Sequence, residues 1–418
     1  MSDNKRTMIL NMLKEGRISV EEADDLLKAS ETKPTFQTPD PGQMFKEGFS
    51  KLEGILKNVG STVEAVAKSV APVIEKQVDN FVSSIKSTLN KQQFTDQETI
   101  VPEIKIESII IDNEWGDVNI VASERNDIEL KVDKLIWAID EKAAQERAGE
   151  LKVGWIIEGN RINFKMPELS TIAFTKDNLN INLFVPNYVS VRTLTRSGDI
   201  KINGINNNQA AIEAKTTSGD MDVKSLNVNE LTMETVSGDI SLKESAGNSL
   251  LKTTSGSINI EGDLKADSKI FTISGDIKAK MLVEETLEIT TTSGDIEIKL
   301  QPDSKGSLIL SSTSGDIYFT GESFNKININ SVSGDIESNA RVKEENNLEI
   351  TSNSGEVMLK LMEDSHFTIA ANTRNGLAEC QMTLDNLEKG THFFKGKFGD
   401  GAGQISLQSV TGNIIVNS

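Results

Sequence analysis

An acidic side chain follows the glycine of a motif that recurs through the second half of the chain. Ser-Gly occurs nine times, and the next residue is Asp or Glu in eight of the nine copies. Stacked carboxylates could bind calcium, a hard cation that prefers several carboxylate oxygens. An acid beside a tight turn can instead accept backbone N–H bonds, and this interpretation is preferred because one carboxylate per repeat makes an incomplete cage. The candidate calcium ligands are Asp276, Asp295, Asp316 and Asp335.

Other residues that could perform chemistry are few. The chain has two histidines, His366 and His392, and a single cysteine, Cys380. One cysteine excludes an intrachain disulfide and multi-cysteine zinc sites, and the histidines lack metal-ligand spacing. The glycine-rich segment 399–403 lacks the Lys-Ser/Thr of a phosphate-binding loop. These residues predict no cofactor and no catalytic centre, so the protein is not expected to be an enzyme.

The repeat pattern determines where these side chains must lie. Successive motif glycines are 18 to 21 residues apart. The residue two places after each glycine is apolar, and so, from the second copy on, is the residue five places before it. The residue three places before it is Thr or Ser in every copy. The two positions before the glycine share one parity, so they share one face of a strand. Each copy is therefore predicted to be a strand, a tight turn, a second strand and a loop, with the hydroxyl column inside or at a corner.

A unit of about 20 residues cannot bury its own apolar face, so the copies must stack. The predicted fold class is mainly β, a repeat β-solenoid with an N-terminal all-α region. A sandwich of stacked β-hairpins would use the same alternation and remains the alternative. A degenerate tenth turn is expected at Asn375-Gly376 and another at Thr411-Gly412-Asn413.

Residues 100–196 are less regular, and regular rungs are expected from about residue 190. Trp115-Gly116-Asp117 resembles a first copy of the turn in which tryptophan replaces serine. A helical insertion is expected at 138–150, with Trp137 and Trp155 packed beneath it.

The N-terminal quarter has helical periodicity and divides into three segments. Residues 1–31 predict a helical hairpin, and residues 32–43, with three of the eight prolines, predict an extended linker. Residues 44–95 predict an amphipathic, coiled-coil-like helix, and residues 96–418 form the β-repeat domain.

The amphipathic segment carries apolar residues at alternating steps of four and three, which is typical of a coiled coil or a groove-binding helix. Its seven lysines and five acids make contact with an anionic membrane an alternative to helix packing. Residues 1–90 are therefore expected to bind a protein partner or to self-associate, with peripheral membrane contact as the alternative. The predicted interface consists of Phe45, Phe49, Leu52, Leu56, Val59, Val63, Val66 and Val70.

The net charge of −19 lies entirely beyond residue 95, because residues 1–95 contain 13 basic and 13 acidic side chains. This charge argues against nucleic acid as a partner, since phosphate binding needs clustered cations. The N-terminus lacks a signal-peptide core, and no stretch reaches the ~18–20 apolar residues of a membrane-spanning helix. The expected location is the cytoplasm or the membrane periphery, with the cell surface, reached by non-classical export, as the alternative.

Several of these segments resemble a bacterial family. The Ser-Gly-Asp-Ile repeats, the Phe-Val-Pro of 184–186 and the closing segment 399–407 resemble the putative-adhesin β-repeat domain. Residues 9–27 resemble the SHOCT-like hairpin that precedes this domain in YvlB- and LiaX-like proteins. The resemblance implies a Firmicute-type protein linked to the cell-envelope stress response, without enzymatic activity.

The residues and the resemblance together predict a non-enzymatic scaffold or interaction protein of the envelope stress response. Its helical N-terminus would bind a partner or a membrane, and its acidic solenoid would present a binding surface. One alternative is an adhesin-like ligand-binding protein at the cell surface. Another is a β-helix polysaccharide-active enzyme, which would need a non-repeating cluster of carboxylates with Arg or Lys in a groove.

Overall fold

The computed structural model describes residues 90–167, 171–172, 175–264, 267–343 and 345–418. The chain divides into two compact units, Met1–Asn80 and Phe81–Ser418, and the described residues belong to the second. The predicted hairpin, linker and apolar interface stripe all lie outside the described residues. None of the helices described is long and apolar enough to cross a membrane.

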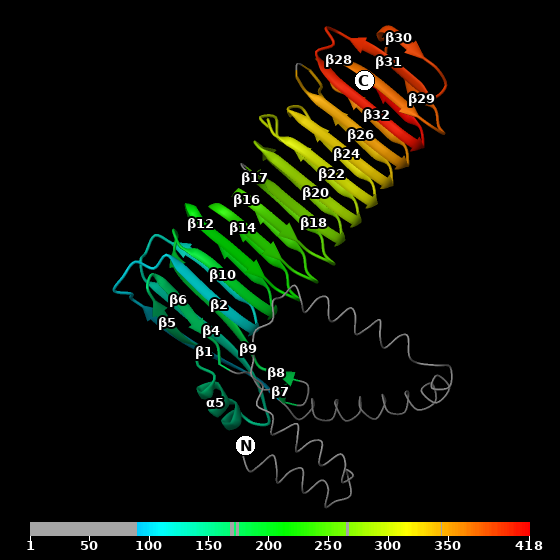
Figure 1. Cartoon of the computed structure of the whole chain (residues 1–418). Helices are drawn as coiled ribbons and strands as arrows, with labels where there is room; N and C mark the ends of the chain where they lie inside the picture. The colour runs from blue at the N-terminus through cyan, green and yellow to red at the C-terminus, as the bar shows by residue number, and fades with distance from the viewer. Residues whose placement is uncertain (1–89, 168–170, 173–174, 265–266, 344) are drawn as a thin grey trace, which may run out of the picture. The chain divides into compact units, whose positions relative to one another are not determined.

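The described unit is a solenoid of two long sheets, here called sheet A and sheet B (Figure 1). In spatial order, sheet A consists of β1 (Asn90–Ile100), β4 (Ile128–Ala138), β9 (Asn178–Pro186), β3 (Val118–Ser123), β11 (Ile200–Asn203), β13 (Met221–Lys224), β15 (Ile240–Lys243), β17 (Ile258–Leu264), β19 (Ile277–Val283), β21 (Ile296–Leu300), β23 (Ile317–Gly321), β25 (Ile336–Ala340), β27 (Val357–Leu361), β33 (Ile414–Asn417) and β29 (Ala378–Cys380). Sheet B consists of β30 (Asp385–Lys389), β31 (Phe393–Phe398), β28 (Phe367–Thr373), β32 (Gly403–Thr411), β26 (Asn347–Ser354), β24 (Lys326–Ser333), β22 (Ser307–Ser314), β20 (Thr286–Ser293), β18 (Ser268–Ser274), β16 (Ala246–Lys252), β14 (Asn227–Glu234), β12 (Asn206–Lys215), β10 (Ser190–Ser197), β2 (Ser108–Trp115), β6 (Arg161–Lys165) and β5 (Gly154–Glu158). A separate two-stranded sheet contains β7 (Thr171–Ile172) and β8 (Thr175–Lys176).

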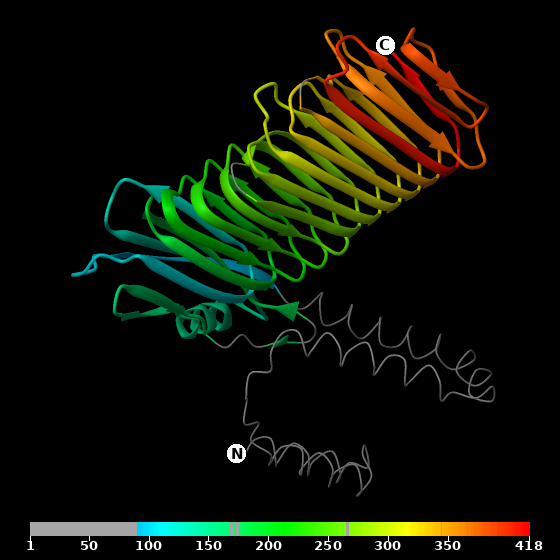
Figure 2. The ribbon, with the colours of Figure 1, turned by 45° about the horizontal axis from the view of Figure 1, so that its top comes forward.

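Each regular rung contributes one strand to each sheet, and the Ser-Gly-Asp turn joins the two. β20 leads through the turn into β21, and the next rung repeats this path with β22 and β23. The pairing between rungs is parallel and in register, so Ile277 stacks on Ile296 and Ile296 on Ile317. Parallel stacking confirms the predicted solenoid and is incompatible with the hairpin sandwich, in which neighbouring strands would be antiparallel. Figure 2 shows the strands stacked along one axis of this unit.

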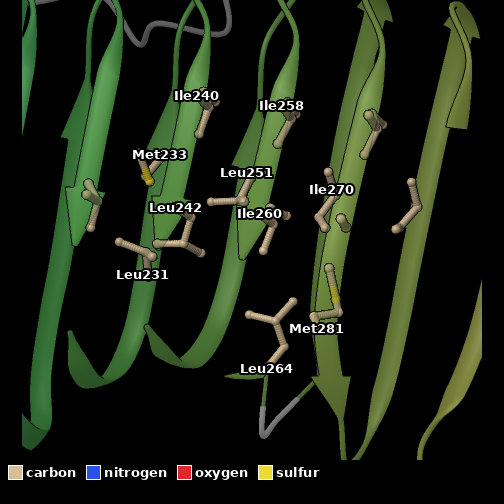
Figure 3. Packing of buried hydrophobic residues seen from close by; sticks show 14 of the residues in the cluster. Leu231, Met233, Ile240, Leu242, Leu251, Ile258, Ile260, Leu264, Ile270 and Met281 are labelled. Atoms are coloured by element: carbon tan, nitrogen blue, oxygen red, sulfur yellow. The ribbon is translucent and has the colours of Figure 1, made fainter. Parts of the chain in front are cut away.

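The core fills the space between the sheets with the apolar columns predicted from the repeat. Ile270, Ile289 and Leu310, five places before their glycines, are at most 1% exposed, as are Ile277, Ile296 and Ile317 two places after. Figure 3 shows such side chains from successive rungs packed side by side. The hydroxyl column is also buried, with all nine Thr and Ser side chains at 0–7% exposure. The predicted shared face is therefore confirmed.

The last two rungs are stacked in the opposite order to the sequence. β32 pairs with β26 on one side and with β28 on the other, so the chain terminus lies inside the stack. The chain leaves a gap after β27, forms β28 to β31, and returns to fill that gap with β32 and β33. The Thr411-Gly412 turn therefore precedes the Asn375-Gly376 turn in space. β31 pairs antiparallel with β28 and, together with β30, covers the end of sheet B.

The N-terminal end is closed by helix α5 (Glu141–Glu150), whose N-cap is Asp140. The helical insertion is confirmed, but it begins after the expected residue 138. Buried Lys134 holds the helix, because its Nζ donates to the Ala148 carbonyl at 2.7 Å and pairs with Asp96. A cation at the C-terminal end of a helix is also favoured by the helix dipole.

Two expectations about this end are wrong. Residues 90–95 belong to strand β1, so the predicted helical segment cannot extend to residue 95, and the β domain begins at least six residues before 96. Pairing with β4 over eleven residues overrides the helical pattern of these few side chains. Trp155 does not pack beneath the helix. It lies on the edge strand β5, is 36% exposed, and donates from Nε1 to Glu98 at 3.2 Å.

Candidate binding surface

The motif glycines form a column in which no side chain fits. A Cβ at Gly294 would lie 2.1 Å from the carbonyl oxygen of Gly275 in the preceding rung. The corresponding distance is 1.9–2.2 Å at every motif glycine from Gly198 to Gly355. The next rung's threonine covers the same oxygen. Thr272 Oγ1, for example, donates to the Gly256 carbonyl at 3.1 Å. The glycine and hydroxyl columns are therefore requirements of stacking.

The acids after the glycines form a hydrogen-bonded ladder. Asp276 Oδ1 accepts the backbone N–H of Asp295 at 3.0 Å, and Asp295 Oδ1 accepts that of Asp316 at 2.9 Å. Asp316 Oδ1 accepts the N–H of Asp335 at 2.8 Å. These bonds offset the repulsion of about 0.9 kcal/mol between neighbouring carboxylates ~4.8 Å apart in water. The structure supports the hydrogen-bonding interpretation, although the donor belongs to the next rung and not to the same turn.

The four candidate calcium ligands therefore lie in one column, each with one oxygen engaged by the backbone. Within the described ranges, no group of three or more His, Cys, Asp or Glu side chains could hold a metal ion. The calcium hypothesis stays a prediction without a coordination cage to support it.

The histidines and the cysteine do not form a catalytic group. His366 Nδ1 lies 3.4 Å from Asp400 Oδ1, and His392 Nδ1 lies 2.6 Å from the Gly376 carbonyl oxygen. Cys380 is half-buried, and its thiol donates to the Met382 carbonyl at 3.6 Å. Burial raises the pKa of the Cys380 thiol, which makes the nucleophilic thiolate scarcer at neutral pH.

The outer face of sheet B has two chemically different halves. A single row of outward side chains crosses the sheet in register, one from each strand. In β12, β14 and β16 this row contains Lys215, Glu234 and Lys252. Lys215 Nζ lies 3.0 Å from Glu213 Oε1 and 3.7 Å from Glu234 Oε2. The N-terminal half is thus a surface of cross-strand ion pairs.

The C-terminal half of the same row carries no charge over six consecutive strands. Its members have hydroxyl or amide side chains, and none of them donates or accepts a side-chain hydrogen bond within the part of the chain that the structure describes. We call this set the hydroxyl–amide row: Thr290, Ser311, Asn330, Thr351, Gln408 and Asn372. Its unpaired donors and acceptors, all partly or fully exposed, are available to a ligand.

An open groove of about 530 Å³ lies at the end of this row, where β28, β31 and β32 meet. Ala370, between Lys395 and Ser406 in register, has only a methyl group, which leaves the surface low at this point. We call it the C-terminal groove. The outward or turn-edge side chains that line it are Ala370, Asn372, Arg374, Phe393, Lys395, Ser406 and Gln408.

Tyr318 is an exposed aromatic on the outer face of sheet A, close to the acid ladder. The charge of Asp316 is the main cause that raises the pKa of Tyr318, followed by partial burial. Its hydroxyl donates to Asp316 Oδ2 at 3.3 Å.

Sequence reasoning did not identify the groove, although one signal was available. Arg374 lies two places before its turn glycine, where the second to ninth copies all have an uncharged residue. Phe393 and Lys395 lie in a segment without the motif, so periodicity could not place them.

The sequence over the solenoid also matches a known family model. The model described as Toastrack DUF4097 matches residues 106–320 and 304–417. The chain belongs to the Toastrack DUF4097 family. A SHOCT-like domain model matches residues 4–35 of the same chain. The resemblance to a SHOCT-like hairpin followed by an adhesin-type β-repeat domain is thus confirmed, and the Toastrack domain is the solenoid described above.

Several solved structures from bacteria are similar to the Toastrack domain. A putative adhesin from Bacteroides fragilis is 12% identical, with 79% of this chain and 98% of that chain covered and a TM-score of 0.31. A putative adhesin from Parabacteroides distasonis is 11% identical, with coverages of 65% and 97% and a TM-score of 0.38. A putative lipid binding protein from the same species is 14% identical, with coverages of 78% and 97% and a TM-score of 0.31. Comparison with curated proteins gives no match.

Proposed function

We propose that the protein is a non-enzymatic, adhesin-like binding protein that holds an extended glycan along the hydroxyl–amide row. The observation that carries this proposal is the run of six uncharged side chains without hydrogen-bond partners on consecutive strands. Hydroxyl and amide groups donate and accept hydrogen bonds, as the hydroxyl groups of a sugar require.

The geometry of the row suits a long, regular ligand. Parallel strands place one side chain about every 4.8 Å along the axis, so a chain lying on the row meets a polar group at each step. Ser, Thr and Asn are short side chains on a rigid ladder, and little conformational entropy is lost when they bind. The ion-paired N-terminal half offers fewer unpaired groups.

Binding without cleavage is proposed because neither the hydroxyl–amide row nor the lining of the C-terminal groove contains a carboxylate. Glycoside hydrolysis normally uses two carboxyl groups that flank the scissile bond. The C-terminal groove is lined by Arg and Lys but by no Asp or Glu, and the repeated carboxylates accept backbone hydrogen bonds on the turn edge.

A binding assay on purified bacterial cell walls and on insoluble polysaccharides tests this function. The full chain is expected to co-sediment with at least one of them. Asn330→Asp combined with Gln408→Glu places two like charges in the row and should weaken binding about tenfold or more, since mispaired polar groups cost ~1–3 kcal/mol each.

The matched control is Asn259→Asp, the same isosteric change at an exposed position on sheet A. It should leave binding unchanged. Absence of binding to every glycan tested, or equal loss in both variants, would contradict the proposal.

A glycan ligand favours the cell surface, the alternative location, over the cytoplasm. We propose this location together with a role in the cell-envelope stress response. Protease treatment of intact cells should degrade the protein, and a deletion strain should change its sensitivity to wall-active antibiotics. Protein that is fully protected in intact cells would contradict the surface location.

The partner of residues 1–90 is proposed to be a protein, bound through the apolar stripe that contains Leu52 and Leu56. Replacing both by Asp should abolish association while the Toastrack domain keeps its thermal unfolding midpoint. Unchanged oligomeric state and unchanged membrane partition in that variant would contradict this interface.

A further inference from the structure

The C-terminal groove has the opposite charge to the rest of the molecule. Its lining contains Arg374 and Lys395 and no acidic residue, in a chain of net charge −19. Two cations at one end of an uncharged row indicate a ligand that is polar along its length and anionic at this point.

The acid ladder also ends before it reaches the groove. In spatial order, the Gly355 rung is followed by the Gly412 rung and then by the Gly376 rung. Glu356 is the last acid of the ladder, and the two rungs beyond it have Asn413 and Leu377 in the equivalent position. An anionic group that approaches the groove is therefore not repelled by the neighbouring turn edge.

Arg374 is available to a ligand, unlike the arginine at the same repeat position in the first regular rung. That residue, Arg196, pairs with Glu114 at 3.1 Å and lies 5.8 Å from the centre of the Trp115 ring. The exposed Arg374 guanidinium makes no ion pair or hydrogen bond with any residue that the structure describes. Lys395 pairs with Glu388 at 2.9 Å, but both side chains are more than half exposed, so the pair can open at little cost.

An aromatic ring and two amides complete the groove. Phe393 is 45% exposed and is paired in register with Asn372, which is paired in turn with Gln408. An exposed ring offers an apolar face to the C–H groups of a sugar, while the amides can bond its hydroxyls.

We propose that the C-terminal groove is a subsite for an acidic sugar unit, whose carboxylate or phosphate pairs with Arg374 and Lys395. This inference rests on the proposed function and names the ligand class as an anionic glycan. Arg and carboxylate or phosphate form charge-assisted, often bidentate hydrogen bonds. The hydroxyl–amide row then holds the neighbouring units of the same chain.

Calorimetric titration of the full chain with three probes tests the subsite. Hyaluronan hexasaccharide bears carboxylates, chitohexaose is a neutral amino-sugar hexamer, and a phosphomannan oligosaccharide bears phosphates on its sugars. The wild type should bind at least one anionic probe more tightly than chitohexaose, and the preferred probe identifies carboxylate or phosphate as the source of charge. Higher salt should reduce the difference.

Arg374→Gln removes the charge and keeps hydrogen-bonding groups. It should weaken binding of the preferred anionic probe about tenfold, since a charge-assisted bond is worth ~1.5–3 kcal/mol, and leave chitohexaose binding nearly unchanged. Phe393→Leu should weaken all bound probes. The matched control, Arg196→Gln, should change none of them.

The outcomes separate the two proposals. Equal affinity of the wild type for all probes, or an equal effect of Arg374→Gln on the neutral probe, would overturn the acidic subsite while glycan binding by the row stands. If no probe binds and no glycan co-sediments, the proposed function itself is wrong. Unchanged thermal unfolding of each variant ensures that a loss reports on binding.

Discussion

The regular rungs and the C-terminal groove differ in how their polar side chains find partners. In the rungs, each Thr and Asp of the motif forms a hydrogen bond with the backbone of the adjacent rung, and the same bonds are repeated along the axis. Thr272 bonds the Gly256 carbonyl and Asp276 bonds the N–H of Asp295 in this way. In the groove, Arg374 and Asn372 have no such partner among the described residues.

This difference follows from the path of the chain. At the motif positions, a regular rung places equivalent residues beside one another, so the same contact recurs from rung to rung. At the C-terminal end the antiparallel pairing of β31 with β28 brings a segment without the motif against a rung. Repetition of the motif therefore supports stability, whereas the break in repetition creates the C-terminal groove.

The largest effect is expected at the glycine column of the rungs. Gly294→Ala would place a Cβ 2.1 Å from a backbone oxygen that cannot move without breaking the stack. We expect a loss of about 3 kcal/mol or more in the free energy of unfolding, measured by urea denaturation. Gly149→Ala, in helix α5 with nothing within 4 Å, should instead stabilise by up to about 1 kcal/mol. Similar effects at the two sites would contradict the steric explanation.

The next largest effect is expected at Lys134, which holds helix α5 at the N-terminal end of the solenoid. Lys134 is 1% exposed, and Lys134→Ala removes its packed stem and leaves the Ala148 carbonyl of α5 without its side-chain donor. The expected cost is about 2 kcal/mol or more. Lys131→Ala, on the same strand, removes an exposed ammonium that lies 3.7 Å from Asp133 Oδ2, and it should cost at most about 0.5 kcal/mol. If both changes cost the same, Lys134 does not hold the helix.

A smaller effect distinguishes two residues at the same repeat position. Thr272→Val leaves the Gly256 carbonyl without its hydroxyl donor and should destabilise by about 1 kcal/mol. Ser352 is buried, and its hydroxyl has no partner within the described structure, so Ser352→Ala should be neutral or slightly stabilising. Chemical denaturation of both variants measures the difference in the free energy of unfolding. A larger loss in Ser352→Ala than in Thr272→Val would contradict the conclusion that only the Thr272 hydroxyl has a hydrogen-bond partner.

The smallest effect is expected on the pKa of Tyr318. Nearby carboxylates, chiefly Asp316, raise the pKa of Tyr318 above its ordinary value of 10.0, because they disfavour the phenolate. The fold therefore favours the protonated Tyr318 phenol. The stability that depends on this proton is fully present below the pKa of tyrosine in the unfolded chain, and it is lost as the pH rises through the raised pKa of the folded protein. Asp316→Asn should lower the pKa of Tyr318, whereas Asp276→Asn, two rungs away, should leave it unchanged. The ultraviolet absorbance of the phenolate during a pH titration measures this pKa. An unchanged titration in Asp316→Asn would exclude the electrostatic cause.

The sequence by itself determined the structure of a single rung and the way in which rungs stack. The spacing of the glycines, the parity of the apolar and hydroxyl columns and the need to stack are all local and repeated, so the solenoid and its buried face could be predicted from them. The acid column was identified as well, although not the fact that its hydrogen bonds cross between rungs.

Only the tertiary structure decided the order of the last rungs and, with it, the groove. Whether β32 lies before or after β28 depends on which pairings bury the most surface, and the periodicity is the same in both orders. Arg374 and Phe393 are 19 residues apart in the sequence and line the same groove because an antiparallel strand returns beside β28. Long-range pairing of this kind is a property of the whole stack, and no local pattern encodes it.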